Sequence, residues 1–162
     1  MRALFLVSLL ILLPAAAFAQ DTGQGVVERL EEFDIQAGPD GEIDGCGDLP
    51  ARAPAGASRV QVEAALRAGL DHAQCLNTRS MESAQGFVDL IAWVSERAHL
   101  LTPAQEALAV AQINRIDARV KANEAWKVDY FRDRLRPVVQ DGNRRLGLDH
   151  DPLGRYLERS AQ

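Results

Sequence analysis

The stretch that decides the fold is residues 102–138, which read TPAQEALAVAQINRIDARVKANEAWKVDYFRDRLRPV. Its first four residues start a helix, because Thr102 can cap the helix, Pro103 suits the first helical position and Gln105 completes a capping box. After Pro103, neither Gly nor Pro occurs before Pro137. Apolar residues recur at helical spacing along one side, with Glu124 as the one interruption: Ile113, Ile116, Val120, Val128, Phe131, Leu135 and Val138. The pattern predicts one helix over about 102–138, roughly 50 Å long.

The residues before this helix predict a partner for it. Ser80 is a candidate cap, and the apolar positions that follow alternate in spacings of three and four, as in a helix-packing seam: Ala84, Phe87, Ile91, Val94, Ala98 and Leu101. The connection at 101–103 is short, so we expect the two helices to fold back on each other as an antiparallel hairpin.

Shorter helices are predicted on both sides of the hairpin. Upstream, Val26, Val27, Leu30 and Phe33 share one helix face, Ser58 with Gln61 opens a helix that Gly69 stops, and Asp71 with Gln74 opens another. Downstream, residues 141–143 (Asp-Gly-Asn) predict a turn, and Asp151-Pro152 opens a last helix with Leu153, Tyr156 and Leu157 on one face. Alternating runs of β-branched residues are missing after residue 19, so the predicted fold class is all-α.

The N-terminal region differs in composition from the rest of the chain. Residues 1–19 have the layout of a secretory signal peptide: a basic start, an apolar run that is too short to span a membrane, and a small-x-small ending at Ala17–Ala19. Residues 20–57 form an acidic, Gly/Pro-rich segment, and residues 58–162 form the helical domain. Nine acidic and one basic side chains fall in 20–50, against 14 acidic and 16 basic in 51–162. We therefore expect a periplasmic or secreted protein without a transmembrane segment after cleavage.

Export determines how the two cysteines are interpreted. In an oxidising compartment, Cys46 and Cys75 favour a disulfide over two free thiols, and the spacing of a redox-active pair is missing. Such a bridge would pin the acidic N-terminal loop to the helical domain.

Several classes of site find little support in the sequence. The formal net charge of −5 argues against a nucleic-acid-binding domain. Asp40, Glu42, Asp44 and Asp48 match part of a calcium-binding loop, but Ala51 stands where the closing glutamate belongs. His72 and Cys75 share a helix face, yet neither they nor His99 and His150 have the spacing of a zinc site. We expect no catalytic, cofactor-binding or metal-binding residues, and no cofactor.

The residues that suggest a function lie on the long predicted helix, away from its apolar stripe. Trp126, Tyr130 and Arg134 are spaced i, i+4, i+8 and form a ridge, with Arg119 on the same side two turns earlier. Trp, Tyr and Arg are the residues most enriched in interface hot spots. Two interpretations stay open, namely that the ridge contacts a partner or that the protein's own N-terminal segment or last helix covers it.

Two functional hypotheses follow. The first is an exported helical protein that acts without catalysis by binding a protein partner in the cell envelope, as a chaperone, inhibitor or assembly factor. The alternative is a small envelope-acting hydrolase that uses a carboxylate. The sequence favours the first, because it supplies a ridge for binding and no recognisable catalytic constellation. It does not indicate an oligomeric state.

Overall fold

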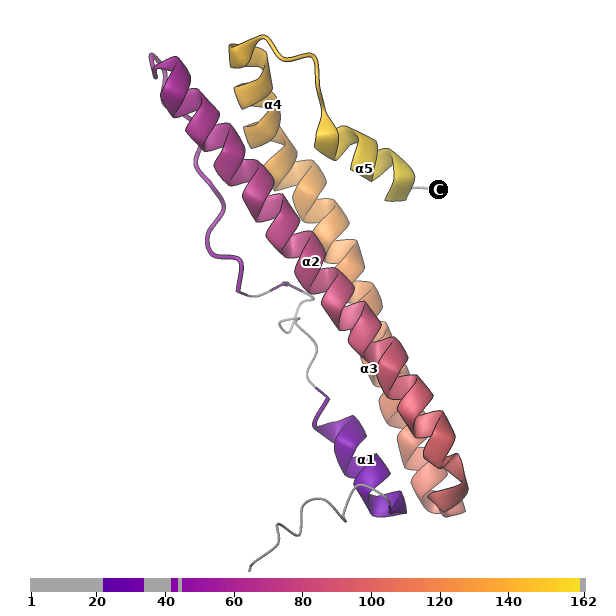
Figure 1. Ribbon diagram of the computed structural model, residues 1–162. Helices are drawn as coiled ribbons and strands as arrows, with labels where there is room; N and C mark the ends of the chain where they lie inside the picture. The colour runs from indigo at the N-terminus through magenta and orange to yellow at the C-terminus, as the bar shows by residue number, and fades with distance from the viewer. Residues whose placement is uncertain (1–21, 34–41, 44, 161–162) are drawn as a thin grey trace, which may run out of the picture.

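The computed structural model describes residues 22–33, 42–43 and 45–160. The predicted signal peptide (1–19) lies outside these residues. Within them every regular element is helical, which confirms the all-α class. The molecule is built on an antiparallel hairpin (Figure 1). One arm is α2 (Arg59–Arg97), and the other is α3 (Pro103–Tyr130) continued through a π-helical turn, η4 (Phe131–Leu135), into α4 (Arg136–Leu146).

The hairpin turn consists of a short 3-10 helix, η3 (Ala98–Leu100), followed by the capped start of α3. Two of the predicted capping pairs are present as capping boxes, at Ser58 with Gln61 and at Thr102 with Gln105. Each satisfies backbone N–H groups that a helix start otherwise leaves without partners. Helices α1 (Gly23–Glu31) and α5 (Pro152–Ser160) flank the hairpin, α1 near its turn and α5 near its other end (Figure 1).

The predicted break at Gly69 is wrong, because α2 runs through it as one helix of 39 residues. Neither Asp71 nor Ser80 starts a separate helix. Gly69 is buried against α4, and a Cβ there would lie 3.2 Å from a methyl carbon of Val139. The glycine therefore serves close packing between helices.

The predicted turn at 141–143 is wrong for the same reason. Gly142 lies inside α4 and is buried against α2, where an added Cβ would lie 3.0 Å from the Cβ of Leu66. The helix ends instead at Gly147, whose φ of +70° is the left-handed conformation that glycine adopts without strain.

Pro137 does not end the second arm of the hairpin either. The π-helical turn lies just before it, and there the Arg136 N–H bonds to the Phe131 carbonyl.

Two hydrophobic clusters hold the hairpin together. The tip cluster, near the turn, joins α1 to both arms through Val26, Leu30, Phe87, Leu90, Val94, Ala109 and Ile116. The base cluster joins α2 to η4, α4, α5 and the N-terminal segment through Ile43, Leu66, Ala73, Leu76, Phe131, Leu135, Val139 and Leu153. Between them lies a polar band of buried side chains, namely Ser80, Ser83, Asn123 and Lys127.

The predicted packing stripe from Ala84 to Leu101 is correct in part. Phe87 and Val94 are buried, but the other contacts come from Ser83 and Leu90. Ala84 and Ala98 are exposed, and Ile91 is 36% exposed. The packed face of α2 is thus rotated from the predicted one, which leaves a second row of apolar residues uncovered. The predicted faces of α1 and α5 are confirmed, because Val26, Val27, Leu30 and Leu153 are buried.

Candidate functional site

A disulfide joins the N-terminal segment to the middle of α2, as predicted. Cys46 and Cys75 have Cα atoms 5.8 Å apart. Ile43 on one side of the bridge is buried in the base cluster, and Leu49 on the other side packs against that cluster. Further along, the Arg145 guanidinium donates hydrogen bonds to the carbonyls of Ala53 and Pro54. The segment that follows α1 is therefore held on the hairpin at several points.

Beside the bridge, a buried histidine connects the segment to the predicted ridge. His72 is 7% exposed, and its Nε2 lies 3.1 Å from the Tyr130 hydroxyl oxygen. Burial lowers the pKa of the His72 imidazole, and a hydrogen bond with the Cys46 backbone offsets this only in part. A neutral imidazole has one donor and one acceptor nitrogen, so Nε2 can accept from Tyr130 while the other nitrogen faces Cys46. His72 is thus a structural link between α2, α3 and the bridged segment.

Tyr130 and Trp126 form the centre of the ridge. Their rings stack with centroids 4.8 Å apart, and both side chains are half-buried against the base cluster. Burial raises the pKa of the Tyr130 hydroxyl, the positive charge of Arg134 lowers it, and the negative charges of Asp48 and Glu42 raise it. The ring therefore stays neutral at physiological pH.

Arg134 and Arg119, the other two residues of the predicted ridge, are both exposed. Arg134 lies within the π-helical turn that follows Tyr130, and it is close enough to influence Tyr130 electrostatically. Two half-buried aromatic rings thus lie near an exposed guanidinium. Its aromatic part rests partly on the protein's own core, and the remainder of each ring is accessible.

The polar band contains a network that the sequence did not reveal. Lys127 is 2% exposed, and its Nζ lies 2.6 Å from a Glu124 carboxylate oxygen and 3.2 Å from the Asn77 side-chain oxygen. Glu124 also accepts hydrogen bonds from the hydroxyls of Ser80 and Tyr156. The network links α2, α3 and α5. The signal for it was the helical spacing of Asn123, Lys127 and Phe131, which places a lysine on the buried face.

The environment of Glu124 keeps its carboxylate ionised. Burial raises the pKa of this group, but hydrogen bonds from Lys127 and Ser80, the charge of Lys127 and the Tyr156 hydroxyl together lower it more. The net pKa lies below its ordinary value. A general acid in glycoside hydrolysis needs the opposite shift.

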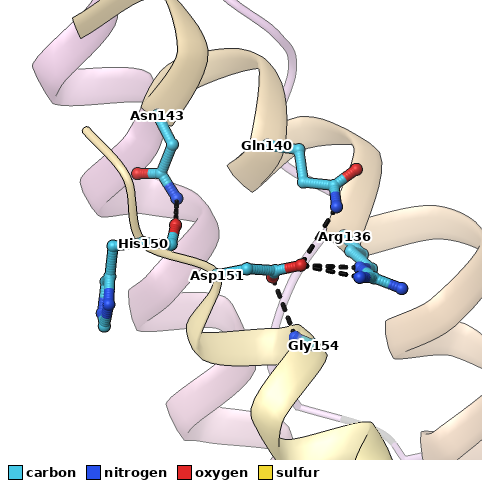
Figure 2. Close-up of polar contacts among 6 residues, drawn as sticks. All are labelled: Arg136, Gln140, Asn143, His150, Asp151 and Gly154. Atoms are coloured by element: carbon cyan, nitrogen blue, oxygen red, sulfur yellow. Dashed lines mark hydrogen bonds and ion pairs between the residues drawn. The ribbon is translucent and has the colours of Figure 1, made fainter. Parts of the chain in front are cut away.

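A second polar cluster docks α5 on α4 (Figure 2). One Asp151 carboxylate oxygen accepts hydrogen bonds from Arg136 and from Gln140, and the other accepts from the Gly154 backbone N–H, 2.8 Å away. Asp151 therefore caps α5 and ties it to α4 with one side chain. The amide of Asn143 donates to the His150 carbonyl just before the helix. Burial raises the pKa of Asp151, but Gly154, Arg136 and Gln140 together lower it below its ordinary value.

The candidate metal ligands that the structure describes are exposed or engaged elsewhere. Asp40 and Asp44 of the calcium-like loop lie outside the described residues, and Glu42 and Asp48 are exposed. Cys75 is in the bridge, and His150 contacts the Arg155 guanidinium. Over residues 22–33, 42–43 and 45–160, the structure brings together no three His, Cys, Asp or Glu side chains in a metal-binding group. In the same ranges, none of the helices combines the length and the apolar character that a membrane span requires.

These features define the class as an all-α, disulfide-bridged helical hairpin with flanking helices. No protein-family model, curated protein or solved structure matches this chain.

Proposed function

We propose that this protein acts without catalysis, by binding another protein in the cell envelope through the ridge of Trp126, Tyr130, Arg134 and Arg119. The observation that carries the proposal is the half-buried Trp126–Tyr130 stack with Arg134 exposed nearby. Such a protein would serve as a chaperone, an inhibitor or an assembly factor.

The physical support for this proposal is preorganisation. Trp126 and Tyr130 are held by each other, by the base cluster and by His72 before any partner arrives. Binding through rigid aromatic side chains loses little rotamer entropy, so more of the contact energy contributes to affinity. Arg134 adds a charged donor next to apolar area, a combination that is frequent at hot spots.

The proposed compartment is the periplasm or the exterior of the cell. The signal-peptide pattern of residues 1–19 motivates this proposal, and the Cys46–Cys75 bridge supports it, because disulfides persist in oxidising compartments. The described carboxylates give the hydrolase alternative little support. Glu124, the carboxylate with three side-chain partners, has its pKa shifted away from that of a general acid.

A site-specific crosslinking experiment tests the proposal. A photo-crosslinking residue replaces Arg134 on the ridge, and in a matched control it replaces Arg59, which is exposed at the start of α2. We expect one protein to be captured in the envelope from position 134 and not from position 59. Equal capture from both positions, or none from position 134, would contradict the proposal.

The energetic prediction concerns Trp126→Ala and the captured partner. Loss of the indole should weaken binding by about 2 kcal/mol, the scale of a hot-spot residue. Because Trp126 is half-buried, the free energy of unfolding should also fall by about 2 kcal/mol, less than for a fully buried aromatic residue. Calorimetric binding and urea unfolding measure the two effects separately.

The companion variant Arg134→Ala removes an exposed side chain and should weaken binding with little change in stability. If both variants bind normally, the ridge is not the interface. Iodide quenching of Trp126 in a Trp93→Phe background checks accessibility, and we expect partial quenching. A fully protected indole would remove the support for a partner-binding ridge.

A further inference from the structure

Helix α2 has an exposed face without charge. Its charged residues from position 71 onward all lie within an arc of about 100° on a helical projection: Asp71, Arg79, Glu82, Asp89, Glu96 and Arg97. The other exposed arc carries only uncharged side chains over about six turns: Gln74, Met81, Ala84, Gln85, Val88, Ile91, Ala92 and Ser95. Depletion of charge is typical of the centre of a protein interface.

The centre of this face is a row that we call the α2 seam: Met81, Ala84, Val88 and Ile91. The spacings of three, four and three are those of a helix-packing stripe. Met81 is 62% exposed, Val88 58% and Ile91 36%. The seam is therefore a second packing stripe, in addition to the one that contacts α3.

Neither flanking helix covers the α2 seam. Helix α1 approaches α2 from another direction, where Phe33 lies over Gly86, two positions from Val88 and so about 200° away around the helix. Helix α5 packs on the base cluster at the other end of the hairpin. On α3, the Gln112 side chain bonds to α1. Val110 lies two positions earlier, about 200° around the helix from Gln112, and is 52% exposed. Among the residues that the structure describes, none therefore covers these apolar side chains of the two arms on the side away from α1.

We propose that the α2 seam binds a second copy of this chain, with the two α2 helices antiparallel about a two-fold axis at the level of residue 86. In this register Met81 faces Ile91 of the second copy, and Ala84 faces Val88 of the second copy. One step outward, Asn77 faces Ser95 of the second copy, so polar residues meet polar residues. A two-fold interface requires this reciprocity, in which each residue's counterpart has the reverse contact.

The charge distribution is consistent with this occupant, and the size of the α2 face sets the expected affinity. Two copies that each carry a formal charge of −5 repel overall, but the facing surfaces are uncharged and the charged arc of α2 stays in solvent. A seam from residue 77 to 95 is roughly 28 Å long, and the face of α2 alone, about 12 Å wide, would bury roughly 700 Å² in total. This area is smaller than that of a stable interface, so the dimer should be weak, with a dissociation constant in the hundreds of micromolar. The proposal is independent of the Trp126 ridge, which lies on another helix.

Sedimentation velocity of the purified protein over about 1–500 μM tests the proposal. The wild type should show a reversible monomer–dimer equilibrium. Val88→Asp should raise the dissociation constant at least about tenfold, because each interface would bury two unpaired carboxylates. The matched control Leu108→Asp places the same charge at an exposed leucine of α3 outside the seam, and its dimerisation should be unchanged. Circular dichroism confirms that each variant is folded.

The register has its own test. Ala84→Lys should also weaken the homodimer, but an equimolar mixture with Val88→Asp should associate, because the introduced lysine then faces the introduced carboxylate. Restored association in the mixture supports the antiparallel register. A wild type that is monomeric at about 500 μM overturns the proposal. A dimer that Val88→Asp leaves intact, or a mixture that does not associate, overturns it as well.

Discussion

At the scale of single residues, His72 connects three parts of the molecule. Its imidazole lies on α2, contacts Tyr130 of α3 and bonds to the backbone at Cys46 in the bridged segment. A neutral ring suits this position, because a protonated ring would lose the acceptor nitrogen that faces the tyrosine hydroxyl. The protonation of one side chain is therefore coupled to how firmly the segment is held.

This coupling predicts a pH dependence of stability. The folded pKa of His72 lies below its unfolded value of 6.5, so between these two values the unfolded chain binds a proton that the folded chain does not. The contribution of His72 is fully present above about pH 6.5 and is lost as pH falls toward the folded pKa. Urea unfolding between about pH 7.5 and 5.5 should show this decline. His72→Gln should flatten it, and a wild-type slope that matches the variant would refute this role.

At the scale of elements, α5 illustrates how a short helix is fixed in place. Its nine residues are too few for independent stability, and its apolar side chains pack on the base cluster. Asp151 supplies the direction of docking, because the same carboxylate caps the helix and accepts from Arg136 and Gln140 of α4 (Figure 2).

Asp151→Ala should therefore loosen α5 without unfolding the hairpin. Loss of a capping side chain costs about 1 kcal/mol, and a partly exposed ion pair adds up to about 1 kcal/mol more. Hydrogen exchange should show faster exchange at residues 154–160, with α2 and α3 unchanged. Asp149→Ala, at an exposed aspartate two residues earlier, is the matched control and should leave exchange as in the wild type. Equal effects of the two substitutions would argue against the specific role of Asp151.

At the scale of the whole molecule, the hairpin has two hydrophobic clusters with a polar band between them. The band places Lys127 and Asn123 where a continuous core would have apolar residues. Buried polar groups bond only in particular alignments, so the band favours one register of α2 against α3. It also divides the apolar contacts into a tip and a base, which can open separately.

Two matched substitutions test this division. Leu30 in the tip cluster and Leu135 in the base cluster are both fully buried, and truncation of either to alanine should cost about 2–5 kcal/mol. Leu30→Ala should increase hydrogen exchange mainly in α1 and near residues 87–116, whereas Leu135→Ala should do so mainly in η4, α4 and α5. Uniform changes along the chain in both variants would mean that the hairpin opens as one unit.

Much of this architecture follows from local sequence signals. The caps at Ser58 and Thr102, the buried face of α1 and the start of α5 each depend on residues a few positions apart. The short connection at 101–103 determined that the arms are antiparallel, and the even cysteine count together with the predicted signal peptide predicted the bridge. Such features are predictable because each is satisfied by the backbone or side chains of its own neighbourhood.

The remaining features depended on which residues lie opposite one another in space. A glycine either ends a helix or admits a neighbouring one, and at Gly69 and Gly142 only the approach of α4 to α2 decided between these roles. Tertiary structure also decided which side of α2 faces α3. By helical spacing, a stripe through Ala84 and Ile91 was as plausible as one through Ser83 and Leu90. Sequence analysis alone thus determined the class, the helix starts at Ser58, Thr102 and Asp151, and the bridge. Only the tertiary structure decided where the helices end, which apolar row is buried and that Lys127 is enclosed, because these outcomes require the partner surface to be in place.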